Sequence, residues 1–481
     1  MKKILNIITV AVLIFFTGCE ENYLERVPTT SITDADLFKT VVGAQTALEG
    51  IHRSTYTFGN AHDQFGQKSI DLAMDVLGED CYQTERGYGW FVSWYQWIDH
   101  RNINAVNLEY VWSYYYDIID NANIILQNVD NASDAAFFVT KVHNIKAQAL
   151  AYRAFSYYQL VQLYATRYVP GGPNAQLGVP LVLVPTQEGL PRSTVAQVYT
   201  QINTDINASI TEFGLGAVSR ANKSELNVNI AQGIKARIAL TTGDYVAAAT
   251  AANAARTGYL PTLDNESGMN SSSDQEWIWG AVLIDEQQTS YASFFSHIDP
   301  SFGGYATLGN QKCLSTAVYD FMSATDERKA MFKDDSPTKL RVGYKFTGWG
   351  EWTNDYLYMK AGEMYLIEAE ALARQGGQDA AAQDVLFTLI STRDPGYVKS
   401  VNTGTALIDE ILMHRRADLW GEGFRFLDLK RLNLALDRTN LGHTASLWNA
   451  AGYFAASDKN FTFLIPKQEM DANPQMVQND L

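Results

Sequence analysis

The sequence predicts a mostly helical protein, because long segments repeat apolar residues at three- and four-residue intervals, as on one face of a helix. Two pairs of such segments are the clearest. A turn containing glycine separates the members of each pair, at Gly243 and at Gly376-Gly377. A short turn between two helices predicts an antiparallel helix hairpin. The pairs are 230–241 with 246–255, and 356–374 with 379–390.

The first hairpin carries alanine at positions where its two helices would meet. Small side chains let helix backbones approach closely, which is typical of tetratricopeptide-like helix hairpins. The interval between the hairpins is irregular, so we expect insertions between the repeats. The alanines are Ala236, Ala239, Ala248, Ala251 and Ala255.

Other periodic segments add helices and a few strands. In the first of them the residues sharing one face are Leu37, Val41, Ala44, Leu48 and Ile51. Ser193 or Thr194 is suited to cap the helix at 195–210. Helices are expected at 36–51, 106–129, 142–165, 195–210 and 408–420, the last leading into 421–432, and strands at 178–184 and 276–283.

Two long segments, 58–105 and 258–355, lack helical periodicity and are rich in Gly, Asp and aromatic residues. We interpret them as large, irregular, loop-rich insertions. Residues 36–481 are therefore expected to form a single α body that carries both insertions.

The composition is that of a globular protein: 46% of the 481 residues are hydrophobic and 19% are charged. The formal net charge is -16 at pH 7. A surface of this sign repels phosphate backbones, so nucleic acid is excluded as a favoured partner.

The N-terminal residues have the pattern of an export signal. Lys2 and Lys3 precede an apolar run over 4–16, which is shorter than the roughly 20 residues of a membrane span. The run ends in Phe16-Thr17-Gly18-Cys19, which is similar to the lipobox of bacterial lipoproteins except that Leu is usual in place of Phe16.

We therefore expect residues 1–18 to be a signal peptide, Cys19 to be acylated, and 19–35 to form a lipidated tether. Several acyl chains on one residue would anchor the protein stably. An ordinary secretory signal with an incidental cysteine is the alternative. Export would permit a disulfide between Cys81 and Cys313, but two buried free thiols are the preferred interpretation.

Tryptophan and tyrosine gather at three places in the insertions, beside glycines in two of them. Flat aromatic faces can cover sugar C–H surfaces, while a few polar groups fix specificity. The alternative is that these rings pin the insertions onto the body. The ligand-binding candidates are Tyr88, Trp90, Trp94, Tyr95, Trp97, Trp277, Trp279, Trp349 and Trp352.

Catalytic and metal motifs are absent from the sequence, so no catalytic residue, metal ligand or cofactor is assigned. Glu363 and Glu370 share a helix face, and a carboxylate pair could serve glycoside hydrolysis. Interhelical ion pairs explain them more economically, together with Glu422, Arg425 and Asp428. An acidic loop with Asp71, Asp75, Glu79 and Asp80 offers carboxylates for a Ca²⁺ site, although these residues lack the EF-hand spacing.

Five motifs in order along the chain resemble the SusD/RagB family of outer-membrane nutrient-binding lipoproteins. Two departures are Asp418 where Glu is usual, and His414 where an acidic residue is common. The matching residues are Trp112, Tyr116, Ile119 and Ala122-Asn123; Arg153-Ala154, Tyr157, Leu160-Val161, Tyr164 and Gly178-Val179-Pro180-Leu181; Pro191-Arg192-Ser193-Thr194-Val195, Val198-Tyr199, Ile202 and Asp205; Arg415-Arg416, Asp418-Leu419, Glu422-Gly423, Arg425, Asp428-Leu429 and Arg431; and Ile465-Pro466, Glu469-Met470, Asn473-Pro474 and Gln478-Asn479.

The resemblance implies a SusD-like lipoprotein of the outer membrane that faces the cell exterior, without enzymatic activity. It would bind a glycan, or a peptide, and deliver it to a SusC-like TonB-dependent transporter. Family members build the ligand site from the insertions and contact the transporter mainly through the helices. Glu20-Glu21 resembles the signal that sends such lipoproteins to the surface. A peptide-capturing lipoprotein and a surface glycoside hydrolase remain as alternatives.

Overall fold

Helices form the body of the protein in the computed structural model, which describes residues 34–481 apart from 264–267, 351 and 449–450. The predicted signal peptide 1–18, the acylation site Cys19, the Glu20-Glu21 pair and most of the tether lie outside the described residues. In the part that is described, no helix is long and apolar enough to cross a membrane.

The α-helices are α2 Asp34–Leu37, α3 Val41–Ser54, α4 Gln67–Leu77, α5 Val92–Tyr95, α6 Val106–Asn128, α7 Val139–Tyr164, α8 Val195–Leu215, α9 Val228–Thr242, α10 Tyr245–Arg256, α11 Phe294–Ile298, α12 Thr316–Phe321, α13 Ala361–Arg374, α14 Asp379–Ile390, α15 Gly404–Asp418, α16 Arg425–Leu432, α17 Ala445–Trp448 and α18 Lys467–Ala472. Short 3₁₀ helices are η2 Asp99–Arg101, η3 Val129–Asn131, η4 Ala135–Phe137, η5 Asp285–Gln287, η6 Glu327–Met331 and η7 Lys459–Phe461. The mostly helical class is confirmed.

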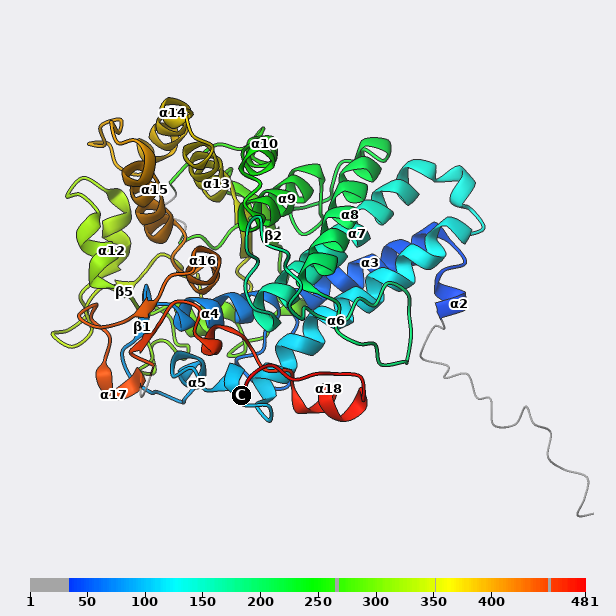
Figure 1. Cartoon of the computed structure of the whole chain (residues 1–481), viewed down its shortest axis with the longest axis horizontal. Coiled ribbons are helices and arrows are strands. Elements are labelled where there is room, and N and C mark those ends of the chain that lie inside the picture. The colour runs from blue at the N-terminus through cyan, green and yellow to red at the C-terminus, as the bar shows by residue number, and fades with distance from the viewer. Residues whose placement is uncertain (1–33, 264–267, 351, 449–450) are drawn as a thin grey trace, which may run out of the picture.

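The long helices stack in chain order. Each of α6 to α10 packs on the next, α10 packs on α13, and α13 packs on both α14 and α15. Figure 1 shows this array running from α3, α6 and α7 on one side of the molecule to α13, α14 and α15 on the other. The alanines predicted to lie between α9 and α10 are all buried, so the predicted close approach is confirmed.

Local sequence fixes several helix ends. Thr194, one of the two predicted caps, accepts a hydrogen bond from the Gln197 amide and forms a capping box with that residue. Asn227 and Asp244 cap α9 and α10 by accepting from the backbone amides of Ile230 and Ala247, without a capping box. Gly243 ends α9 with φ 78°, a left-handed conformation that glycine adopts without a Cβ penalty.

Three predictions of secondary structure were wrong in part. The segment 356–374 is not one helix, because Tyr356–Lys360 forms strand β6 before α13 begins. All five strand residues are buried, and such a continuous apolar run does not distinguish a strand from a buried helix. The segment 178–184 contains no strand, and the helix expected at 36–51 is divided before Thr40, which caps α3.

The strands are short and belong to the two insertions and the C-terminal region. A four-stranded sheet has the order β1-β3-β5-β4, β2 pairs antiparallel with β6, and β7 pairs with β8. The strands are β1 Cys81–Gln83, β2 Trp277–Ala281, β3 Lys312–Leu314, β4 Phe332–Lys333, β5 Val342–Gly343, β6 Tyr356–Lys360, β7 Leu436–Asp437 and β8 Tyr453–Phe454.

The two cysteines lie on adjacent strands of the four-stranded sheet as free, buried thiols. Tyr82 stands directly opposite Cys313, and Cys81 stands opposite Leu314. Successive side chains of a strand point to opposite faces, so Cys81 and Cys313 are on different faces of the sheet. This register explains why the preferred interpretation of two free thiols holds.

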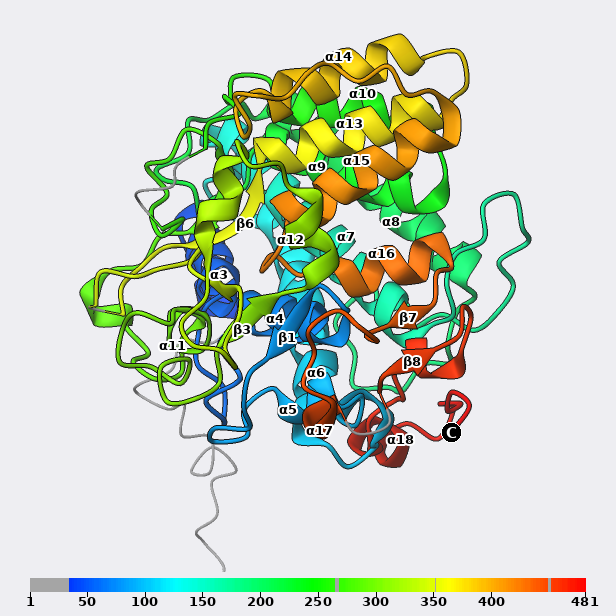
Figure 2. The ribbon, with the colours of Figure 1, turned by 90° about the vertical axis from the view of Figure 1, so that its left-hand side faces the viewer.

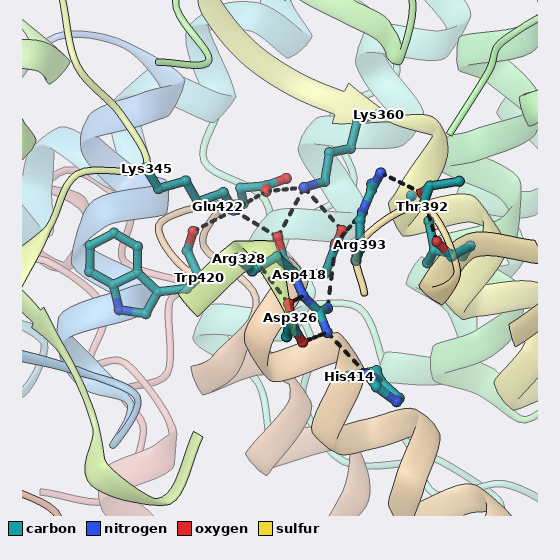
Figure 3. Close-up of polar contacts among 12 residues, drawn as sticks. Asp326, Arg328, Lys345, Lys360, Thr392, Arg393, His414, Asp418, Trp420 and Glu422 are labelled. Atoms are coloured by element: carbon teal, nitrogen blue, oxygen red, sulfur yellow. Dashed lines mark hydrogen bonds and ion pairs between the residues drawn. The ribbon is translucent and has the colours of Figure 1, made fainter. Parts of the chain in front are cut away.

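A buried network of ion pairs joins the second insertion to the helical body, and Asp418 at the end of α15 is its centre (Figure 3). The Asp418 carboxylate lies 2.9 Å from Arg393 Nε and 3.1 Å from Lys360 Nζ. Lys345 Nζ donates to the Asp418 carbonyl oxygen at 2.7 Å. Asp418 is buried, and burial alone would raise the pKa of its carboxyl. The surrounding cations, Arg393 foremost, outweigh burial and hold this pKa well below its usual range.

The same cations bind further carboxylates. Glu422 lies 2.6 Å from Lys345 Nζ and 2.8 Å from Lys360 Nζ, and Glu276 lies 2.5 Å from Arg393 Nη2. Each of these buried charges in the network around Asp418 therefore has an opposite charge within contact distance. Because Glu276, Lys345 and Lys360 flank or belong to the second insertion, the network fixes that insertion on the body.

Replacing Asp418 by Ala is expected to lower the free energy of unfolding by about 3–5 kcal/mol, because the buried cations Arg328, Lys360 and Arg393 would lose their shared carboxylate. Urea-induced unfolding, followed by tryptophan fluorescence, measures the change. The matched control is Asp384→Ala, which removes a surface pair with Lys399 and should cost about 0–1 kcal/mol. Equal losses in the two variants would contradict the role of the network.

Candidate functional site

Eight rings from the two insertions touch one another in an unbroken series, which we call the aromatic platform. Trp90 stacks on His62 with ring centres 5.7 Å apart. Tyr305 contacts both rings and also Tyr88 and Tyr291. The platform consists of Phe58, His62, Tyr88, Trp90, Tyr291, Phe302, Tyr305 and Trp352. No ring of the series is fully buried, and Tyr88 is 71% exposed.

The first insertion presents Tyr88 and Trp90 on a loop between β1 and α5. Asn310 Nδ2 donates to the Trp90 carbonyl oxygen at 3.1 Å, which ties this loop to the second insertion. Phe91 follows with φ 61° and is buried. The left-handed conformation is uncommon for a bulky residue. It lets consecutive side chains separate, with Trp90 at the surface and Phe91 in the core.

The second insertion presents Tyr305 on the loop after α11. The Tyr305 ring stacks on buried His297 with centres 5.0 Å apart. Burial lowers the pKa of His297 well below its usual value, so this imidazole is neutral. His297 Nε2 contacts the His62 carbonyl oxygen at 2.8 Å, and His62 Nδ1 contacts the Tyr305 hydroxyl at 2.6 Å. The two insertions are therefore locked together directly beneath the platform.

The far end of the platform is formed by Trp352, which contacts Tyr291 and Phe302. Trp352 has φ 60°, another left-handed conformation at a bulky residue. Such strain persists where surrounding structure holds it, commonly at functional sites. A Cβ at Gly350 would come within 2.9 Å of the Phe302 ring, so only glycine leaves room for this ring. Trp349 is 53% exposed beside it.

Hydrogen-bonding groups remain available along the ring edges. Among the described residues, the hydroxyls of Tyr88 and Tyr291 and the indole N–H of Trp352 make no hydrogen bond. Arg86 is exposed two residues before Tyr88, and Glu85 pairs with Lys339 at 3.3 Å. Exposed apolar faces edged by donors and acceptors suit a polyhydroxylated ligand.

Four of the nine predicted ligand residues are at this surface: Tyr88, Trp90, Trp349 and Trp352. The structure corrects the prediction for the other five. Trp94, Tyr95 and Trp97 lie on or beside α5 and are buried. Trp97 is 4% exposed, stacks on Phe454 at 4.4 Å and donates from Nε1 to the Leu77 carbonyl oxygen. A ring without an exposed face cannot stack on a ligand.

Trp277 and Trp279 are also core residues, at 0% and 1% exposed. They belong to β2, whose five residues are all buried between the helices and β6. The Trp279 ring contacts Phe155 of α7 at 5.5 Å. These two tryptophans anchor the insertion to the helical body, which is the alternative that the sequence left open.

The carboxylates singled out from the sequence have structural partners. Glu363 pairs with Arg237 at 2.7 Å, and Glu370 pairs with Arg431 at 2.8 Å, which confirms the ion-pair interpretation. At the considered Ca²⁺ site, Asp80 pairs with Arg416 at 2.5 Å and Glu79 pairs with Arg425. Asp75 accepts from the Gly423 amide, and Asp71 accepts from Gln67. Within the described ranges no group of three or more His, Cys, Asp or Glu could hold a metal ion.

The sequence patterns that selected the ligand-binding candidates did not include Phe58, His62, Tyr291, Phe302 and Tyr305. The run Ser301-Phe302-Gly303-Gly304-Tyr305 places two aromatic residues beside glycines, the same pattern that selected Trp90. That pattern could have found Phe302 and Tyr305. No local pattern marks His62, because its role depends on contacts with Tyr305 and Trp90 across the two insertions.

Two family models match the chain. Residues 28–240 match a SusD-like family described as starch-binding and associating with the outer membrane, and residues 336–481 match the SusD family. SusD-like protein P2 of Formosa agariphila is 23% identical over 90% of this chain and 91% of its own. SusD-like protein P25 of the same organism is 28% identical, over 34% of this chain and 30% of P25.

Solved structures share the fold over nearly the whole chain. A SusD-like carbohydrate-binding protein of Bacteroides vulgatus superposes with a TM-score of 0.80 at 23% identity, covering 92% of this chain and 98% of that protein. A SusD superfamily protein of Bacteroides thetaiotaomicron gives 0.77 at 24% identity, covering 92% and 100%. A laminarin-binding SusD-like protein gives 0.68 at 19% identity, covering 91% and 98%.

A helical-repeat body that presents a series of exposed and half-buried rings on two locked insertions has the architecture of a binding scaffold, in which a rigid body positions loops. The two family matches and the shared fold then identify the family. The chain belongs to the SusD/RagB family of proteins associated with the outer membrane.

Burial predicts that two aromatic residues of the same loop region contribute very differently to the free energy of unfolding. Trp97→Ala should lower the free energy of unfolding by about 3–5 kcal/mol, because it empties a packed site. Tyr88→Ala should change it by less than about 0.5 kcal/mol, because the ring is exposed. Urea titrations of both variants measure the difference. A large loss in Tyr88→Ala would mean that this ring is structural.

Proposed function

We propose that the protein is a surface-exposed lipoprotein that binds an oligosaccharide on the aromatic platform and delivers it to a SusC-like TonB-dependent transporter. The single observation that carries the proposal is the unbroken series of exposed and half-buried rings from Phe58 to Trp352. The similar laminarin-binding protein supports a glycan as the ligand.

The platform would bind sugar by its faces and edges together. Successive pyranose rings would lie on Tyr88, Tyr305 and Trp352, each covering apolar ring surface. The free tyrosine hydroxyls and the Trp352 indole N–H would bond sugar hydroxyls. Because His297 and the ion pairs around Asp418 already hold the loops in place, little ordering would be needed on binding.

The two alternatives have less support. A peptide could also pack its side chains on the platform, so a ligand screen includes peptides. For glycoside hydrolysis, the helix pair Glu363 and Glu370 is engaged by arginines. Assays for released reducing ends, run with any oligosaccharide that binds, test hydrolysis directly.

Loss of one platform ring should weaken oligosaccharide binding without unfolding the protein. A glycan and peptide array on the full-length chain in mild detergent would first supply a ligand. Trp352→Ala and Tyr88→Ala should each then cost about 1–3 kcal/mol of binding free energy, as for loss of a buried side-chain contact. Isothermal titration calorimetry measures the affinities.

Tyr453→Ala is the matched control, since Tyr453 is an exposed aromatic residue on β8 outside the platform. Its affinity should equal that of the unmodified protein. If the platform variants bind normally while remaining folded, the ligand site is elsewhere. If only peptides bind, the peptide alternative replaces the glycan.

Anchoring is tested at Cys19. In cells that lack the transporter, Cys19→Ala should move the protein from the membrane fraction to the soluble fraction, because acylation would be its only attachment. Fractionation followed by immunoblotting measures the distribution. Firm membrane association of Cys19→Ala in those cells would contradict the lipid anchor. In cells with the transporter, the acylated protein should co-purify with a large β-barrel.

A further inference from the structure

A groove of about 380 Å³ lies between α6, the segment 180–190 and α18. Its volume falls in the range of ligand pockets, roughly 300–1,000 Å³. Motif residues that the platform does not use line it, including Trp112, Tyr116, Pro180 and Asn473. In Figure 2, α18 at this groove and α11 beneath the platform lie well apart, so the two surfaces are separate.

The charge of the groove is one-sided. Asp117, Asp120, Glu188 and Glu469 line it, and no lysine, arginine or histidine does. Partial burial raises the pKa of Asp117, and repulsion from Asp120 raises it further. A cationic ligand would relieve this repulsion.

The occupant is larger than a metal ion, because the part of the chain that the structure describes holds no group of three acidic residues close enough for one. Carboxylates spread along α6, α18 and the intervening segment suit an organic cation on an extended ligand. Ammonium and guanidinium groups are the cations that pair with carboxylates by charge-assisted hydrogen bonds.

Trp112 supplies a second and independent indication. Its side chain is only 5% exposed, and it lines the groove. The indole N–H is a donor only, and it has no hydrogen-bond partner among the described residues. The Tyr116 hydroxyl, by contrast, donates to the Pro180 carbonyl oxygen at 2.9 Å. The occupant should therefore offer an acceptor as well as a cation.

A peptide has both groups, whereas a fully protonated polyamine has no acceptor. The lining also includes the half-buried apolar side chains of Val182 and Leu190, which suit the apolar residues of a peptide. The Trp112 ring is too deeply buried to serve as a stacking face for a sugar.

We propose that this groove binds a protein segment bearing lysine or arginine, with the cation among the carboxylates of Asp117, Glu188 and Glu469 and a main-chain carbonyl oxygen on the Trp112 indole N–H. The proposal does not depend on glycan binding at the platform.

The test uses the full-length chain in detergent and a fluorescent peptide, acetyl-Gly-Leu-Lys-Leu-Arg-Gly-amide, with fluorescence anisotropy as the readout. A second peptide carries Glu in place of both basic residues. The double variant Asp117→Asn/Glu188→Gln should weaken binding of the basic peptide roughly tenfold. Trp112→Phe, which keeps a ring but removes the donor, should weaken it about fivefold.

The control is Asp320→Asn/Asp409→Asn, which removes two exposed carboxylates outside the groove and should leave the affinity unchanged. The proposal is overturned if this control weakens binding as much as the groove variant, or if the acidic peptide binds equally well. Absence of binding at about 1 mM basic peptide, well above the Kd of a specific site, also overturns it. An amino-sugar oligosaccharide is run in parallel, and charge-dependent binding of that probe alone would replace the peptide by a glycan.

Discussion

The buried carboxylate of Asp418 is the constraint on which much of the molecule depends. Its cation partners are Lys360 at the end of β6, Arg393 after α14 and Arg328 in the second insertion. A buried charge without its partners is costly, so these segments are held in one arrangement. The insertion carrying Tyr291 and Tyr305 is thereby fixed against the helical body. The platform is therefore held rigid by the buried ion pairs around Asp418, which a ligand on the platform would not contact.

The helical hairpins could be predicted because their periodicity is local and α9, α10 and α14 obey it closely. Strand β6 could not, since its residues are buried on both sides and lose the alternation that marks a strand. The sequence also could not show which tryptophans are buried. Trp90 and Trp97 stand in the same glycine- and aromatic-rich stretch, and only tertiary contacts to His62 and Phe454 separate their roles.

Two surfaces of different chemistry use this one scaffold. The platform offers ring faces and edge donors, suited to a neutral polyhydroxylated ligand. The groove offers Asp117 and its neighbouring carboxylates, suited to a cation. The platform lies on loops of the two insertions, and the groove lies where the segment 180–190 meets α6, because loops placed by a rigid body can present side chains without strain on the core. The family motifs contain Asp418 and Glu422 of the ion-pair network. They also contain Trp112, Tyr116 and Asn473 of the groove, whereas none of the platform rings belongs to a motif.

The central claim is that the rings are already arranged for sugar before a ligand arrives. A crystal structure of the full-length chain with an oligosaccharide selected on the array tests it most directly. The account predicts sugar rings on Tyr88, Tyr305 and Trp352, with these side chains in the positions seen without ligand. Sugar bound away from the platform, or bound only after Tyr305 leaves His297, would contradict it.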